Sequence, residues 1–357
     1  MINGIARLNF GVEEVALCAR FLDDFGIPRI EATSDHALYR LAEGSYVSIR
    51  SLDDPALPRS AQVGCGVREV IWGVDDAESL RRHVADLSRD HEVTQDEEGI
   101  YHFLPSFGQA MGLKLFQKLP VVSSPSPINA PGLTQRFNQW RKWRKRAEPK
   151  QIMHSVFTYP DVNEALDFFR SRLHFRVTEV QVGMGIYLRC PGSSMHHNIA
   201  LVDAHVPVFN AEGQLKYDHT NFVVEDIDEL MIGKSYMESQ GWEKSSFGLG
   251  RHRIGSALFL YIPSPLGGDI EYGADVDAID DTWIPHLWSL DFGFRNWVHN
   301  PPPFMMQEPE HKLGFVDGAT VRHRAAAEWI ETGETPPPPA NQESQDIKAG
   351  ATSAAVN

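Results

Sequence analysis

Two histidines of this sequence occupy the same position relative to an acidic turn. His154 lies seven residues before Asp161, and His219 lies seven residues before Asp226. A lone strand histidine is more often structural than a ligand, but a repeated position is hard to obtain from unrelated core residues. Glu271, in GGDIEYG, adds a carboxylate among residues that otherwise alternate apolar and small. Two imidazoles and one carboxylate form a facial triad that suits Fe(II) or Mn(II) and leaves positions open for a substrate and dioxygen.

A repeated structural unit would position these three side chains. Four stretches, beginning at residues 5, 67, 153 and 219, share an alternating apolar strand, an acidic turn, an amphipathic helix and further strands. In the third stretch Asp161 can serve as an N-cap, and the apolar residues after it follow helical spacing. Each stretch therefore predicts a βαβββ module, and two modules share one curved sheet. The expected fold class is α+β, with four such modules paired into two domains.

The repeats predict an amino-terminal domain at residues 1–120 and a carboxy-terminal domain at residues 151–275. Aligning the two halves tests whether both could bind a metal. The aligned pairs are Ala6 with His154, Arg68 with His219, and Leu113 or Lys114 with Glu271. Because the first half offers no ordinary set of metal ligands, we expect it to keep the scaffold without the metal. The second half alone should be catalytic.

Composition narrows the class of partner. The chain has 357 residues, 42% of them hydrophobic, and a formal net charge of −15. This acidic excess argues against nucleic acid or an anionic membrane as the main partner and favours a small molecule. Three scattered cysteines are too few for a disulfide framework or a thiolate zinc site. No apolar run reaches a membrane-spanning length and the first residues lack signal-peptide features, so we expect a cytoplasmic protein.

Three segments lie outside the repeats. Residues 121–150 begin as a Pro-rich and Ser-rich loop and become basic, which predicts a connector ending in a solvated helix anchored by Trp140 and Trp143. An anion-binding or membrane patch is the alternative for this stretch. Residues 276–330 are rich in aromatic residues and predict either a lid over a pocket or a packed extension. Residues 331–357 have almost no core-forming side chains and should be disordered.

The segment LGRHRIGSALFLYIPSPLGGDIEYG, residues 249–273, resembles the signature of the type I extradiol ring-cleavage dioxygenases of the vicinal oxygen chelate superfamily. The matching positions are His252, Tyr261, Pro265, Gly267 and Glu271. The segment MHHNIAL, residues 195–201, is similar to that family's His-His-x-Ile-Ala strand. Strong resemblance covers about residues 151–275, and scaffold-level resemblance covers about residues 1–118. The stretch from Asp203 to Lys216 is longer than is usual, and Ile254 and Gly255 replace polar residues that some relatives carry.

The resemblance implies extradiol cleavage of a catecholic substrate, with both atoms of dioxygen inserted at a non-haem Fe(II) held by His154, His219 and Glu271. It implies that His197 is the acid–base residue, and that Tyr261 and His252 hydrogen-bond substrate oxygens. It also implies a homo-oligomer. Separately, Arg295 in the aromatic segment is a candidate to bind a substrate carboxylate, because arginine can do so bidentately.

Other functions on the same scaffold stay open. A hydroquinone-cleaving dioxygenase would use a similar site. A metal-dependent glyoxalase-like isomerase or lyase commonly shares its ligands between modules and does not call for the set of His197, His252 and Tyr261. A drug-sequestering binding protein would carry no metal triad, so the sequence disfavours it.

Overall fold

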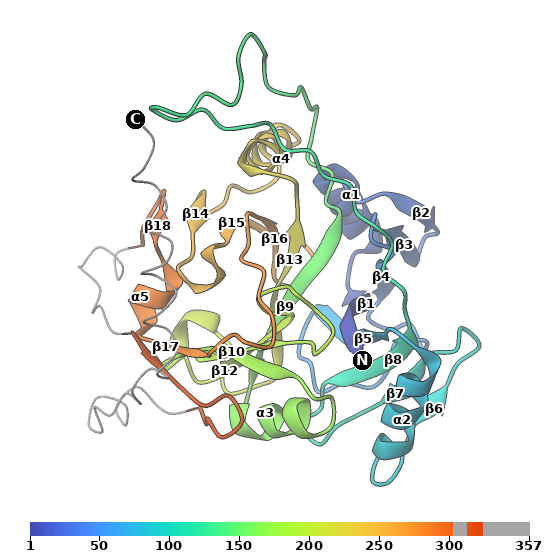
Figure 1. Cartoon of the computed structure of the whole chain (residues 1–357). Helices are drawn as coiled ribbons and strands as arrows, with labels where there is room; N and C mark the ends of the chain where they lie inside the picture. The colour runs from blue at the N-terminus through green and yellow to red at the C-terminus, as the bar shows by residue number, and fades with distance from the viewer. Residues whose placement is uncertain (303–312, 324–357) are drawn as a thin grey trace.

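The computed structural model describes residues 1–302 and 313–323. Two mixed β-sheets lie side by side, the amino-terminal one on the right of Figure 1 and the carboxy-terminal one on the left. The first sheet comprises β1 (Ile2–Val12), β2 (Arg29–Ala32), β3 (His36–Arg40), β4 (Tyr46–Ser51), β5 (Gly66–Val74), β6 (Thr94–Gln95), β7 (Tyr101–Phe103) and β8 (Ala110–Leu115). Its spatial order is β2-β3-β4-β1-β5-β8-β7-β6.

The second sheet repeats this arrangement and extends it. Its strands are β9 (Gln151–Tyr159), β10 (Arg176–Gln181), β11 (Gly185–Arg189), β12 (Ile199–Asp203), β13 (Lys216–Val223), β14 (Gly250–Arg251), β15 (Leu258–Pro263), β16 (Asp269–Ala274), β17 (His286–Trp288), β18 (Trp297–Val298) and β19 (Leu313–Phe315). The central eight follow the order β10-β11-β12-β9-β13-β16-β15-β14. Strands β17 and β19 lengthen one edge, and β18 lengthens the other.

Pairing inside the sheets confirms the predicted four-module fold. The first strands of paired modules, β1 with β5 and β9 with β13, are antiparallel. The first and last strands of each module are parallel neighbours, with a helix in the connection that begins each module. These helices are α1 (Val15–Phe25), α2 (Ala77–Leu87), α3 (Val162–Ser171) and α4 (Ile227–Ser239). The domain boundaries proposed from the sequence are a finer statement and stay a prediction.

One apolar core joins the two halves. Phe25 at the end of α1 stacks on Tyr272 of β16, with ring centroids 3.9 Å apart. Trp72 of β5 packs edge-on against Phe175, with centroids 4.9 Å apart. Because interdigitated aromatic rings bury large apolar areas, the amino-terminal half is a rigid support for the carboxy-terminal sheet.

Helix caps explain why the histidines repeat their positions. The Asp161 side chain accepts hydrogen bonds from two amides of the first turn of α3, as predicted, and the Asp226 side chain accepts one from an amide of the first turn of α4. Each cap fixes where the helix begins, and therefore fixes the register of the preceding strand. His154 and His219 consequently lie at equivalent places on β9 and β13.

The same caps correct the alignment of the two halves. The residue that caps α2 is Asp76 and not Asp75, so the position equivalent to His219 is Glu69 rather than Arg68. Helix α1 likewise begins one residue later than the alignment assumed. A shift of one residue turns every strand side chain to the opposite face. The corrected equivalents are Arg7 instead of Ala6, Glu69 instead of Arg68, and Gly112 instead of Leu113 or Lys114. These three also lack the His-His-Glu combination.

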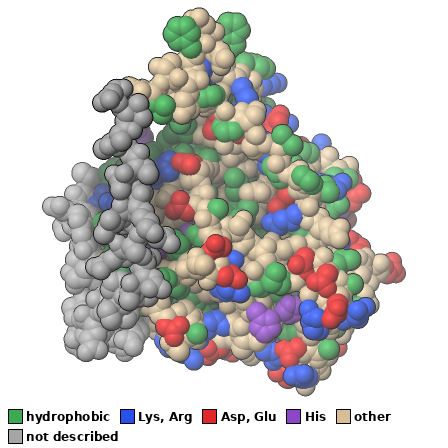
Figure 2. Space-filling view, in the orientation of Figure 1, with side chains coloured by type: hydrophobic (Ala, Val, Ile, Leu, Met, Phe, Trp, Pro, Cys, Tyr) green, Lys and Arg blue, Asp and Glu red, His purple; other side chains and the backbone are tan. Residues whose placement is uncertain are grey.

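The predicted helix in the connector is wrong. Residues 121–150 contain no helix, and Trp140 and Trp143 are 92% and 84% exposed rather than anchored. This segment arches over α4 in Figure 1, and hydrophobic side chains project at the top of Figure 2. Arg141 pairs with Asp228, and Arg144 pairs with Glu229 and Glu225. The cations are therefore held against α4 and its preceding turn, which leaves the tryptophans outward.

The aromatic segment after β16 packs on the second sheet. It forms β17, β18, β19 and the short helix α5 (Leu290–Phe294), which Figure 1 shows at the left of the molecule. Strand β17 pairs in parallel with β10, and β18 pairs with β14. The predicted disordered tail, residues 331–357, lies outside the described residues. Among the residues that are described, no helix has the length and apolar character needed to cross a membrane.

Candidate metal centre and cavity

Three strands bring the predicted metal ligands together. His154 projects from β9, His219 from β13 and Glu271 from β16. His154 Nε2 lies 3.3 Å from His219 Nε2 and 3.4 Å from Glu271 Oε2. His219 Nε2 lies 3.5 Å from the same oxygen. The three atoms form a nearly equilateral triangle, the arrangement in which three ligands can share one cation on one side.

The state of these atoms fits a cation. Glu271 is 1% exposed, and its Oε2 has no hydrogen-bond partner among the described residues. Burial raises the pKa of Glu271, although the neighbouring imidazoles partly oppose this. A buried carboxylate oxygen facing two imidazole nitrogens costs free energy unless a positive charge lies between them. The residues present therefore suit a divalent metal ion.

Asp218 orients one of the ligands. Its Oδ2 lies 2.5 Å from His219 Nδ1, so Nδ1 carries the proton it donates and Nε2 keeps a free electron pair. Burial alone would lower the pKa of His219, but this hydrogen bond and the nearby carboxylates raise it. The pairing register shifts between Tyr217 and His219, which marks a β-bulge at Asp218. The bulge allows two adjacent strand residues to reach each other, and sequence reasoning missed it.

Asp218→Asn is expected to weaken metal binding about 10–100-fold, because loss of a partner that orients a ligand has that typical effect. Competition with a coloured chelator measures the affinity, and circular dichroism checks that the fold is kept. Unchanged metal affinity in this variant would contradict the orienting role of Asp218.

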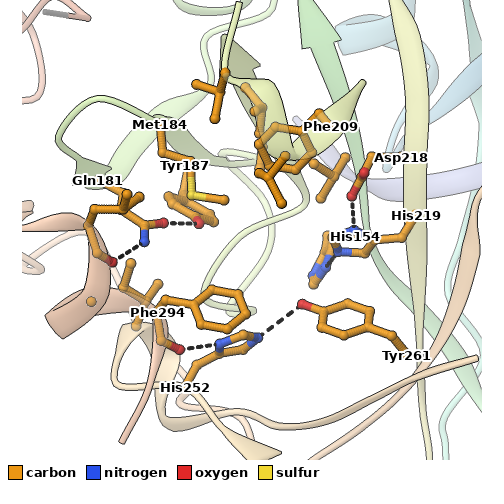
Figure 3. Close-up of a pocket in the computed structure, with 18 of the residues that line it drawn as sticks. His154, Gln181, Met184, Tyr187, Phe209, Asp218, His219, His252, Tyr261 and Phe294 are labelled. Carbon is orange, nitrogen blue, oxygen red and sulfur yellow. Dashed lines mark hydrogen bonds and ion pairs between the residues drawn. The ribbon is translucent and has the colours of Figure 1, made fainter. Parts of the chain in front are cut away.

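A cavity of about 260 Å³ opens beside the triad. His154, His219 and three other predicted residues line it: His197, His252 and Tyr261. In Figure 3, His154, His219 and Tyr261 lie on one side of this cavity, facing Met184 and Tyr187 on the other. The structure thus brings together the predicted metal ligands and the predicted catalytic residues.

His197 belongs to a buried chain of hydrogen bonds. It lies in the turn before β12, with Nδ1 3.0 Å from His196 Nδ1, and His196 Nε2 is 3.0 Å from Glu179 Oε1. Burial disfavours the charge on Glu179, but hydrogen bonds from His196 and His286 hold its pKa below the usual value. A carboxylate at this place accepts the His196 Nε2 proton, which makes the other nitrogen of His196 an acceptor for His197. His197 then presents an unprotonated Nε2.

Sequence reasoning missed Glu179. It lies on β10, in the run RVTEVQVG, where polar residues and valines are mixed. It is 1% exposed, and Trp288 Nε1 also donates to it at 2.7 Å. Because Arg176, Thr178 and Gln181 in the same strand are also polar, the sequence carried no signal that this carboxylate is buried.

His252 and Tyr261 form a second hydrogen-bonded pair. The Tyr261 hydroxyl lies 3.2 Å from His252 Nε2, and His252 Nδ1 lies 2.5 Å from the carbonyl oxygen of Phe294. That carbonyl can only accept, so Nδ1 carries the proton and Nε2 accepts from Tyr261. Burial lowers the pKa of His252 and raises that of Tyr261 well above its usual value. Near neutral pH both side chains are therefore uncharged.

The segment after β16 contributes to the cavity wall, but not through the predicted arginine. Leu290, Asp291, Gly293 and Phe294 of α5 line the cavity. Arg295 directly follows Phe294 but is not among the described lining residues, and its pairing with a substrate carboxylate stays a prediction. Whether α5 opens as a lid stays a prediction.

The chain is similar to known proteins over most of its length. No family model matches the chain. Metapyrocatechase 2 of Cupriavidus necator is 27% identical over 321 residues, which cover 87% of this chain and 93% of the relative. The structure of a Mn(II)-bound glyoxalase from Novosphingobium aromaticivorans superposes with a TM-score of 0.64, at 18% identity and with 87% and 95% of the two chains covered. The structure of BphC, a halotolerant catechol dioxygenase, gives a TM-score of 0.64 at 18% identity, covering 88% and 99%.

These similarities confirm the predicted resemblance to extradiol ring-cleaving dioxygenases and the predicted vicinal oxygen chelate fold. They extend over most of the chain and are not limited to the two motifs. The glyoxalase shows that the same scaffold also carries other metal chemistry. The type of reaction therefore has to be inferred from the residues of the site.

Proposed function

We propose that this protein is an extradiol dioxygenase that cleaves a catecholic ring next to its two hydroxyl groups, using dioxygen and an Fe(II) held by His154, His219 and Glu271. The observation that carries this proposal is the triangle of three ligand atoms, which lie within 3.5 Å of one another beside a cavity lined by His197, His252 and Tyr261. Similarity to metapyrocatechase 2 supports it.

A bound Fe(II) would supply the Lewis acidity and the electron transfer that the reaction with dioxygen needs. Side chains of the protein would carry out the proton transfers. Burial lowers the pKa of His197 well below its ordinary value, so its ring is neutral before substrate binds. The Glu179 carboxylate, linked through His196, would stabilise the charge that His197 gains when it accepts a proton from a substrate hydroxyl. The hydrogen bonds from Glu179 through His196 hold the His197 ring in the tautomer whose Nε2 is unprotonated. His197 can return the proton later in the reaction.

Tyr261 and His252 would hold the substrate oxygens. The Tyr261 hydroxyl is kept protonated by burial, and in the structure its one proton is donated to His252 Nε2. When substrate is bound, this hydroxyl would turn away from His252 and donate to a substrate oxygen that gains negative charge. The apolar remainder of the cavity excludes water, which strengthens these hydrogen bonds.

The compartment, the oligomeric state and the binding partners are part of the same proposal. The three cysteines are free thiols, which supports a reducing compartment such as the cytoplasm. We also propose that several copies of the chain assemble into a homo-oligomer. Catechol and dioxygen are the proposed partners, and Mn(II) would fit the same ligands as Fe(II).

The test is anaerobic loading with Fe(II), followed by dioxygen and a panel of catechols. We expect a yellow ring-opened product and consumption of one dioxygen per catechol, both lost in His154→Ala. Hydroquinones are tested in parallel because a hydroquinone-cleaving dioxygenase would use a similar site. The hemithioacetal of methylglyoxal with glutathione is tested because a glyoxalase has the same scaffold. Turnover of either with no dioxygen uptake on any catechol, in protein that contains metal, would overturn the proposal.

A further inference from the structure

The cavity has an apolar end that the catalytic residues do not use. Val156, Ala200 and Val202 form a small buried cluster of their own. Met184 and Phe209 pack against it, and both line the cavity together with Val206 and Val208. Figure 3 shows Met184 and Phe209 on the far side of the cavity from Tyr261. This end has the shape and chemistry of a pocket for an apolar group.

We propose that this end is a subsite for an uncharged hydrophobic substituent on the catechol ring, and that catechols bearing a carboxylate are poor substrates. The proposal rests on the proposed function, because it assumes that the two hydroxyl groups face the triad. It names the substrate class that the chain selects.

The charges around the cavity support the exclusion of anions. Among the described lining residues there is no lysine or arginine, whereas Asp218, Asp269 and Asp291 all contribute. A carboxylate at the apolar end would lose its hydration, and none of these lining residues is a lysine or arginine that could pair with it. A neutral substituent avoids both costs.

The polar groups at the apolar end engage one another. The Tyr187 hydroxyl donates to Gln181 Oε1 at 2.8 Å, and Gln181 Nε2 donates to the carbonyl oxygen of Leu290 at 2.6 Å. Gln181 is fully buried. Its amide is therefore committed to holding Tyr187 and α5 in place, so it is a poor partner for a polar substituent.

The mouth of this end is formed by the long stretch between β12 and β13. The short 3₁₀ turn Pro207–Phe209 carries Val208, which lines the cavity and yet is 57% exposed. Val206 and Phe209, also in this stretch, are half-buried. A hydrophobic substituent would cover these apolar surfaces, which is favourable in proportion to the area removed from water. The inserted stretch is thus the specificity-determining element.

The first experiment compares substituents. With Fe(II)-loaded protein we expect kcat/KM to rise about fourfold for each methylene added to an alkyl substituent, until the subsite is filled. We expect a carboxylate-bearing catechol to have kcat/KM at least about tenfold below its own methyl ester. Dissociation constants of the same compounds, measured by calorimetry without dioxygen, should follow the same order.

A positive charge introduced at Val208 tests whether the substituent binds at this end of the cavity. Val208→Lys should raise the ratio of carboxylate to methyl ester kcat/KM about tenfold, and its exposure allows the lysine to be tolerated. The matched control is Ile30→Lys on β2 in the other half, because Ile30 does not line this cavity and is 52% exposed; that ratio should not change.

The outcomes separate the two proposals. If catechols are cleaved but carboxylates and esters react equally well, or if Val208→Lys leaves their ratio unchanged, the subsite is overturned and the dioxygenase function stands. If no catechol is cleaved but the anaerobic binding order holds, the dioxygenase function and the claim about substrates fail, and the apolar end stands as a binding subsite only. If neither order is found, both proposals are overturned.

Discussion

Glu271→Gln is expected to lower metal affinity by more than about 100-fold and to remove dioxygen consumption with it. Glutamine keeps the shape of the side chain but brings a neutral amide to the point where two imidazole nitrogens lie 3.4 and 3.5 Å from the carboxylate oxygen. Loss of a partner that only orients a ligand already costs 10–100-fold, so loss of a ligand's charge should cost more. Bound iron after gel filtration, together with chelator competition, gives the affinity.

The matched control is Glu69→Gln. Glu69 is also 1% exposed, and it lies at the position of β5 that is equivalent to His219 on β13. It accepts a hydrogen bond from Asn9 at 2.7 Å and pairs with His102 at 2.6 Å. This variant should lower the free energy of unfolding by about 1–3 kcal/mol and leave metal affinity unchanged. Equal loss of metal in both variants would show a general loss of structure and would contradict the assigned role of Glu271.

The sequence was sufficient to predict the fold because one pattern occurs four times. Aspartates that cap helices set the register of the preceding strands, and register decides which face each side chain occupies. His154 and His219 could therefore be paired before the structure was known. The same reasoning failed by one residue in the first half, because Asp75 and Asp76 are adjacent and either could cap α2.

The rest depended on contacts between residues far apart in the sequence. The connector was expected to be helical from its composition, but ion pairs with Asp228 and Glu229 hold it in an extended path. The hydrogen bond from His252 to the carbonyl of Phe294 joins residues 42 positions apart. No local pattern encodes which backbone carbonyl a histidine will meet, so neighbours of this kind become visible only after the chain is folded.

The position of α5 beside the cavity also depends on contacts that no local sequence pattern predicts. The aromatic residues after β16 indicate either a lid or a packed extension, and in the structure this segment adds a strand to the sheet and lines the cavity. The backbone of α5 also receives hydrogen bonds from Gln181 and His252. The segment therefore controls the shape of the cavity and the tautomer of a proposed catalytic residue. It is part of the site and not an appendage.

His197→Gln is expected to lower kcat by about 10²–10⁴-fold while the protein keeps its metal. Glutamine can still donate and accept hydrogen bonds but cannot take up a proton, and general acid–base catalysis typically contributes that factor. His197 is not one of the three converging ligands. Stopped-flow measurement of ring opening in protein with a determined iron content gives kcat for each metal site.

Two further measurements separate proton transfer from packing. The His197 ring stacks on the His154 ring with centroids 4.2 Å apart, so its replacement could disturb a ligand as well as remove a base. If His197→Gln loses iron as readily as His154→Ala, its role is to support the ligand and the assignment of the acid–base residue is wrong. His205→Gln, whose side chain is 68% exposed and paired with Asp203, is the matched control and should change neither iron content nor kcat. Retained iron with lost turnover in His197→Gln alone would then place the proton transfer at this residue, because metal binding and the fold would both be intact.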